Sequence, residues 1–206
     1  MENDKYLKDL SEIKNMMDRS SRFISLSGLA GVFAGCYAII GAIAAGMLLS
    51  GNDFRLTNDL NSDIISDLFL ISIAVLLLAI GTAIFLTTRK AKKNGQKTWD
   101  NTSRRLLINF FAPLVAGGIF CLVLLQNGLL YLIIPSMLIF YGLALIHGSK
   151  YTFADLKGLG YANVILGLIA TQFVDYAIYF WAVGFGLFHI IYGIWMHNKY
   201  DRKTAE

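Results

Sequence analysis

The sequence predicts an all-α membrane protein in which six transmembrane helices, joined by short outer turns, follow a cytoplasmic amphipathic helix. Apolar residues make up 56% of the 206 residues and charged residues 16%, a composition that favours lipid as the solvent of the folded chain. Apolar stretches recur at lengths near the roughly 20 residues that an α-helix needs to cross a bilayer. They cover residues 23–49, 64–86, 106–125, 129–147, 156–173 and 177–196.

The basic residues are divided unequally between the two sets of connections. Alternate connections, beginning with the N-terminal segment, hold 5, 7, 2 and 3 of the 18 Lys and Arg residues, whereas the opposite connections hold only Arg55. An excess of Lys and Arg marks the cytoplasmic loops of inner membrane proteins. We therefore expect a multi-pass protein of a bacterial inner membrane, with a helical bundle at residues 23–200. The amino terminus and the tail at residues 201–206 are both expected in the cytoplasm.

The N-terminal segment, residues 1–22, predicts an amphipathic helix on the cytoplasmic side. Tyr6, Leu10, Ile13 and Met17 follow helical spacing. Acidic residues balance the basic ones in this segment, so attraction to anionic lipid is weak. Two interpretations stay open: the helix packs against a second copy of the chain or against the cytoplasmic side of the bundle, or it lies in the membrane interface.

The connection at residues 87–105 combines many basic residues with one indole, which fits the setting of topology and contact with membrane lipids. A specific site for a phospholipid or an acidic protein partner is the alternative. Nucleic acid is not expected despite the net charge of +4, because the basic residues lie beside the ends of spans. Asn94 and Gly95 are expected to end the preceding helix. The candidate headgroup contacts are Arg89, Lys90, Lys92, Lys93, Trp99, Arg104 and Arg105.

Small residues form ridges on the first and last spans. In lipid, such ridges let two helix backbones approach closely and gain dispersion contacts. We expect the first span to be central to the bundle or to a homo-oligomer, although chance enrichment of Ala and Gly gives the same pattern. The candidate packing residues are Ala30, Gly31, Ala34, Gly35, Ala38, Ala42, Gly46, Gly186 and Gly193.

His189 lies deep in the last span and shares a face with Gly186 and Gly193, so it is expected to point into the bundle. Asn163 lies on a small-residue face of the fifth span at a comparable depth. We predict a contact between these two side chains, direct or through water. Its role is either a structural hydrogen bond or, with Tyr192, a site for a ligand or a proton.

No cofactor, metal site or catalytic residue is predicted. Three histidines raise the possibility of haem, but His147 and His197 lie at the ends of spans and His189 lies deeper, so no pair shares one level. Phosphate-binding, metalloprotease and serine hydrolase motifs are lacking, which argues against an enzyme. Asp67 and Asp175 are interpreted as hydrated groups at helix ends, with a proton or cation entrance as the alternative.

Two segments of similar sequence end inward-running spans, at residues 139–151 (IFYGLALIHGSKY) and 189–200 (HIIYGIWMHNKY). Each contains Tyr-Gly followed by His and Tyr, which suggests either duplicated helical hairpins or the usual composition of interfacial span ends.

At residues 25–37 (SLSGLAGVFAGCY), 102–121 (TSRRLLINFFAPLVAGGIFC) and 180–193 (FWAVGFGLFHIIYG), the chain resembles a family of uncharacterised bacterial six-span inner membrane proteins. The resemblance extends over nearly the whole chain. It implies a six-span architecture and an inner membrane location, and it implies no activity.

These features favour a non-enzymatic sensor, scaffold or accessory subunit that works on the cytoplasmic side, where most of its water-exposed residues are expected. The alternative is a small transporter, or a protein that binds a lipid or another small ligand, with a polar interior pocket around His189.

Overall fold

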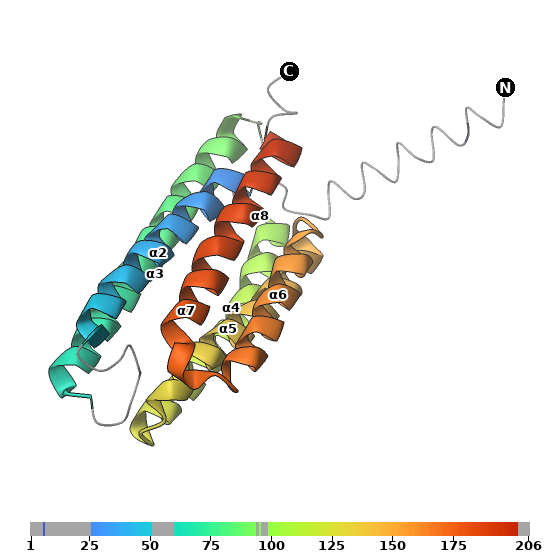
Figure 1. The fold of residues 1–206 in the computed structure, drawn as a ribbon. Coiled ribbons are helices and arrows are strands. Elements are labelled where there is room, and N and C mark those ends of the chain that lie inside the picture. Colours follow the sequence, from blue (N-terminus) through green and yellow to red (C-terminus); the bar gives the residue numbers. More distant parts are fainter. Residues whose placement is uncertain (1–5, 7–25, 51–59, 94, 96–98, 202–206) are drawn as a thin grey trace.

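The computed structural model describes residues 6, 26–50, 60–93, 95 and 99–201, which form a bundle of antiparallel helices (Figure 1). Its helices are α2 (Gly28–Leu49), α3 (Ser62–Lys93), α4 (Asn101–Gln126), α5 (Ile133–Gly148), α6 (Leu156–Ala170), α7 (Ala177–Trp181) and α8 (Phe188–Met196). Short 3-10 turns occur at η2 (Leu130–Leu132), η3 (Ser149–Tyr151) and η4 (Val174–Tyr176), and π turns at η5 (Ala182–Leu187) and η6 (His197–Asp201). The predicted amphipathic helix at residues 1–22 lies outside the described residues, except for Tyr6.

Five helical stretches are long and apolar enough to cross a membrane: Gly28–Leu49, Ser62–Lys93, Asn101–Gln126, Leu130–Tyr151 and Val174–Asp201. The remaining stretch, α6, has 15 residues. At ~1.5 Å per residue it is about 22 Å long, shorter than the ~30 Å hydrocarbon core. The predicted span at 156–173 is thus too long, because the helix ends at Ala170 and a turn follows.

The predicted basic loop at residues 87–105 is largely helical. Helix α3 continues through Lys93, since Ala, Lys and Arg favour helix outside the apolar stretch. Gly95 follows with a positive φ of 64°, a conformation that favours glycine, so the predicted helix end is confirmed. Asp100 then caps α4: its carboxylate accepts a hydrogen bond from the Ser103 amide at 2.7 Å, and the Ser103 hydroxyl accepts one from the Asp100 amide at 2.8 Å.

The two prolines occupy different positions in their helices. Pro113 lies inside α4, where its missing donor interrupts the hydrogen-bond ladder. Pro135 is the third residue of α5, so it stands in the first turn of that helix. A missing backbone donor costs little there, because first-turn amides have no partner within the helix.

The last helical stretch is central in the bundle. Figure 1 shows α7 and α8 between the pair α2–α3 and the group α4–α5–α6, in agreement with their contacts to α2, α5 and α6. Buried Ile134 and Leu138 of α5 meet Ala177 of α7 in the core, where Trp181 and Phe185 pack against them. The sequence predicts that the first span is central to the bundle or to a homo-oligomer, and α2 packs against α3, α7, η5 and α8. One face of α2 is exposed, including Phe33, Ile40 and Met47.

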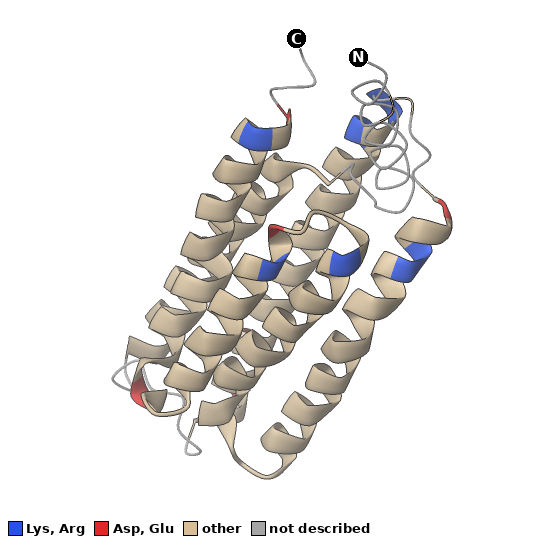
Figure 2. Ribbon diagram, turned by 90° about the vertical axis from the view of Figure 1, so that its right-hand side faces the viewer, with Lys and Arg blue, Asp and Glu red and all other residues tan. Residues whose placement is uncertain are grey.

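Charges are distributed unequally between the two ends of the bundle. Figure 2 shows the described Lys and Arg residues gathered toward the end where α3 stops and α4 starts. At the opposite end the described residues carry carboxylates, Asp63 and Asp67 on α3 and Asp175 in η4, and no Lys or Arg. We call these the basic end and the acidic end.

Candidate functional site

His189 makes two hydrogen bonds inside the bundle. Its imidazole is 7% exposed, with Nδ1 2.9 Å from the Gly184 carbonyl oxygen and Nε2 2.6 Å from the Tyr141 hydroxyl. A carbonyl oxygen only accepts, so Nδ1 carries the hydrogen, and in the neutral ring the Tyr141 hydroxyl donates to Nε2. This arrangement joins α8 to α5 and leaves neither ring nitrogen free for a ligand.

The local backbone explains how the imidazole reaches Gly184. The π turn η5 alternates small and large residues, Ala182-Val-Gly-Phe-Gly, and such turns widen a helix locally and redirect its carbonyl groups. The rings of Tyr141 and Phe185 lie against the imidazole, with centroids 5.3 Å and 6.2 Å away. The imidazole therefore lies among aromatic rings, away from water.

Asn163 is fully buried on α6 but does not bind His189. Its amide nitrogen donates to the Leu159 carbonyl at 3.0 Å, and its Oδ1 has no hydrogen-bond partner. A Cβ atom on Gly184 would lie 3.0 Å from that oxygen. A direct hydrogen bond between His189 and Asn163 is therefore not formed, since Gly184 lies beside both side chains. The alternative contact through water stays a prediction.

Tyr192 also has a buried hydroxyl group. Its hydroxyl is buried without a hydrogen-bond partner, and its electrostatic neighbours are Asp155, Tyr200 and Tyr141. Among the described residues no hydrogen bond joins Tyr192, His189 and Asn163 to one another, and their role as a ligand or proton site stays a prediction. Tyr141, which sequence reasoning missed, is the residue that His189 meets; the sequence similarity between residues 139–151 and 189–200 pairs it with Tyr192 and was the one available signal.

At the basic end, Asp201 joins three helices. Its carboxylate accepts hydrogen bonds from Lys90 at 2.6 Å, from the Gly28 amide at 3.1 Å and from His197 at 3.1 Å. The Gly28 amide is in the first turn of α2, where a carboxylate is electrostatically favoured. Lys90 also donates to the Leu26 carbonyl at 2.8 Å. These bonds link α2, α3 and η6.

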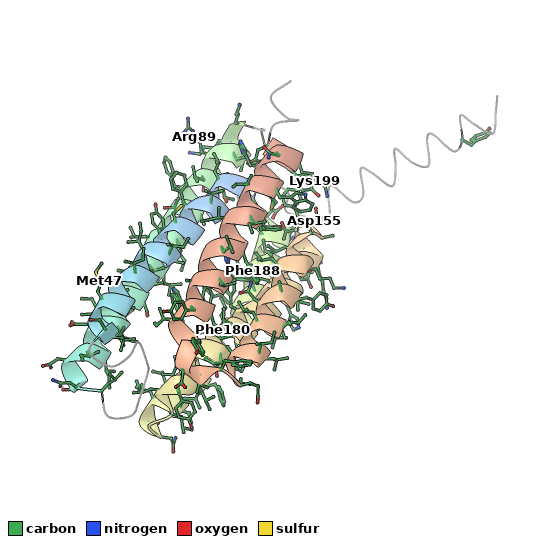
Figure 3. The ribbon with its side chains drawn as sticks, viewed as in Figure 1. Met47, Arg89, Asp155, Phe180, Phe188 and Lys199 are labelled. Atoms are coloured by element: carbon green, nitrogen blue, oxygen red, sulfur yellow. The ribbon has the colours of Figure 1, made fainter. Side chains whose placement is uncertain are left out.

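A second cluster links α6 to η6. Lys199 and Tyr200 both donate to Asp155 Oδ2, at 2.8 Å and 2.5 Å, and Figure 3 shows Lys199 beside Asp155. Partial burial raises the pKa of Asp155, but the hydrogen bonds from Lys199 and Tyr200 and the charge of Lys199 outweigh burial and lower it below 3.8. The Lys199 ammonium also lies 4.5 Å from the centroid of the Trp195 ring.

The candidate headgroup residues fall into two groups. Lys90 is half-buried and bound to Asp201, so it serves the fold. The others have exposed side chains: Arg89, Lys92, Lys93, Trp99, Arg104 and Arg105.

The glycine ridges bring α2 and α8 into backbone contact. A Cβ atom on Gly193 would lie 2.6 Å from the Val32 amide nitrogen, and one on Gly35 would lie 2.6 Å from the Gly186 carbonyl oxygen. Gly31 likewise faces the Gly193 backbone. Among the predicted packing residues, Ala30 and Ala38 are buried and Ala34 is half-buried.

Toward the acidic end, small residues of the same ridge border apolar cavities. Ala42 lines two apolar cavities of about 450 and 490 Å³, the second of which also includes Gly46. The first of these cavities, of about 450 Å³, lies between α2, α3, α4, α5 and α7. Ala42 and Gly46 thus border cavities, while Gly41 contacts α3: a Cβ atom on Gly41 would lie 2.7 Å from Cγ2 of Val75.

The histidines occupy separate environments: His147 is exposed, His197 binds Asp201, and His189 is enclosed. Among the described residues, no three His, Cys, Asp or Glu side chains are grouped to hold a metal ion. Asp67 and Asp175 are both exposed at the acidic end.

No family model, curated protein or solved structure matches the chain. The structure supports a possible multi-pass helical membrane protein.

Proposed function

We propose that this chain is a bacterial inner membrane protein that crosses the bilayer six times, with both termini in the cytoplasm. In this proposal it acts without enzymatic turnover, as a sensor, scaffold or accessory subunit that meets its partners at the basic end. The partners are membrane lipids together with a second copy of the chain or a cytoplasmic-side protein.

The single observation that carries the proposal is the separation of charge. Exposed Lys92 and Lys93 at the end of α3, exposed Arg104 and Arg105 at the start of α4, and Lys157 at the start of α6 all belong to one end of the bundle. Positively charged ends remain on the cytoplasmic side during insertion. Exposed Trp99 beside them adds an amphipathic ring suited to the interface or to a protein contact.

The interior gives less support to the alternative of a transporter or ligand-binding protein centred on His189. Both imidazole nitrogens have partners within the protein, and Asn163 and Tyr192 have different surroundings. A ligand at His189 would have to displace the Tyr141 hydroxyl or the Gly184 carbonyl.

Cysteine labelling tests the orientation. In a background with Cys36 and Cys121 replaced by Ala, Lys93→Cys and Asn127→Cys place single thiols at the basic end and at the opposite turn. A membrane-impermeant maleimide, applied to cells whose outer membrane is permeabilised and whose inner membrane is intact, should label Asn127→Cys at once. It should label Lys93→Cys only after the inner membrane is permeabilised, and the reverse pattern would overturn the proposal.

Photo-crosslinking tests the working surface. A photo-reactive amino acid in place of Trp99 should yield a discrete protein adduct in native membranes, whereas the same group in place of Leu77, an exposed apolar residue on α3, should yield lipid adducts. Protein adducts at Leu77 and none at Trp99 would contradict a partner site at the basic end.

A further inference from the structure

The apolar cavity between α2, α3, α4, α5 and α7 is a built feature of the bundle, created where helices diverge. Near the basic end α2 lies against α8 through glycine backbones, but at Gly41, Ala42 and Ala45 no bulky side chain projects from α2. Trp181 of α7 and Phe69 of α3 form other walls. The resulting volume of about 450 Å³ falls within the ~300–1,000 Å³ typical of ligand sites.

The chemistry of the walls excludes a polar occupant. Nearly all lining side chains are apolar, and the hydroxyls of two lining serines are already satisfied by their own helix. Ser66 donates to the Ser62 carbonyl at 2.9 Å and Ser72 donates to the Leu68 carbonyl at 2.9 Å. Water or a polar solute would therefore find few groups to bind, whereas a hydrocarbon chain would lose none of its interactions.

The position of the cavity identifies the occupant. It begins in the first turns of α3 and reaches Ser72, within the apolar stretch of that helix, and exposed Phe69 and Leu122 stand at its edge. At this depth the surrounding solvent is acyl chain. The acidic end carries Asp63 and Asp67, one helical turn apart on α3, and no described Lys or Arg. This charge disfavours an anionic headgroup above the opening.

We infer that this cavity binds one acyl chain of a phospholipid without net negative charge, drawn from the leaflet at the acidic end. The acyl chain fills the gap left by the small residues of α2. It takes the place of bulky side chains that the helices around the cavity lack. The inference requires the membrane location but not the scaffold role, so it can fail while the orientation of the chain in the membrane is upheld.

Trp181 provides a reporter because its indole lines the cavity, held by a hydrogen bond from Nε1 to the Ala38 carbonyl at 3.3 Å. In a Trp99→Phe/Trp195→Phe variant it is the single tryptophan. This variant, reconstituted in vesicles of phosphatidylcholine with brominated acyl chains, should show strong quenching of Trp181 fluorescence relative to unbrominated vesicles. Adding brominated phosphatidylglycerol to unbrominated phosphatidylcholine should quench it less than brominated phosphatidylcholine does at the same mole fraction.

Cavity-filling variants distinguish quenching by an acyl chain inside the cavity from quenching by lipids at the outer surface of the protein. Ala45→Leu, or Ser72→Leu if the first does not fold, should remove most of the quenching, whereas Ala44→Leu, which lines neither cavity, should leave it unchanged. Equal quenching in all variants, or none in the parent, would overturn the inference. If a second copy of the chain filled the gap, Trp181 would stay unquenched and Phe69→Cys would give a disulfide-linked dimer.

Discussion

The hydrogen bond between Tyr141 and His189 is the interior polar contact on which the packing of α5 against α8 can be tested. Buried polar groups stabilise a fold when both partners are present and destabilise it when one is removed, because the other keeps its desolvation cost. Measured couplings of this kind between membrane helices are modest, ~0.6 kcal/mol on average.

Tyr141→Phe should lower the stability of the purified protein by about 1 kcal/mol, since Nε2 of His189 then has no donor. His189→Leu removes this Nε2 acceptor, so in that background Tyr141→Phe should lower the stability by a smaller amount. Thermal unfolding in detergent followed by tryptophan fluorescence measures this cycle, with the exposed Tyr179→Phe as control. Strictly additive losses would show that the two side chains are not coupled.

Asp155 predicts a pH dependence at the basic end. Because its pKa is lowered in the folded protein, its contribution to stability is present above the unfolded value near 3.8 and is lost as the pH falls through the folded pKa. Asp155→Asn should therefore lower the melting temperature at about pH 7, and the difference from the parent should shrink progressively as the pH falls below about 3.8. Asp67→Asn, at the acidic end, is the control. A constant difference between Asp155→Asn and the parent at all pH values would contradict the assignment.

At the scale of elements, substitutions at two adjacent glycines of α4 distinguish the effect of helix packing on stability from the effect of helix propensity. A Cβ atom on Gly117 would lie 2.4 Å from Cβ of Phe140 on α5, whereas one on Gly118 meets nothing within 4 Å. Gly117→Ala should destabilise the protein by about 1–3 kcal/mol through overpacking. Gly118→Ala should be neutral or stabilise it by up to ~1 kcal/mol, since Ala is the better helix former. Melting temperatures in detergent compare them, and equal effects would refute the close contact of α4 with α5.

Much of the element order is readable from the sequence because lipid imposes a length on each apolar stretch and requires every backbone polar group to be satisfied. The helix end at Gly95 was an equally local signal. The π turn at Ala182–Leu187 was not readable, since it depends on how α7 and α8 fit against two neighbours. For the same reason the inward position of His189 followed from its small neighbours, but the choice of Tyr141 over Asn163 depended on the rotation that η5 introduces.

The whole molecule combines helices of unequal length. Helix α3 has 32 residues and α6 has 15, or about 48 Å and 22 Å at ~1.5 Å per residue. A long helix can tilt or extend into water, but a short one requires local thinning of the bilayer or burial of its ends by protein. Helix α6 meets α5 through Gly142, Gly160 and Gly167, so its polar backbone is shielded along this face by a neighbouring helix.

These contacts lead us to expect that α6 crosses the membrane despite its length. Lys150 precedes it at the basic end and Gln172 follows it, both exposed, so single cysteines at these sites report its two ends. In the background with Ala at Cys36 and Cys121, an impermeant maleimide should label Gln172→Cys from outside and Lys150→Cys only after permeabilisation. Labelling of both from the same side would mean that α6 re-enters without crossing.

The chain would then span the membrane five times, and Lys199 could not lie on the same side as Lys93, although Lys199 binds Asp155 at the start of α6. The charge separation thus favours six membrane crossings, whereas the short length of α6 favours five. The pairing of Lys199 with Asp155 supports the crossing by α6.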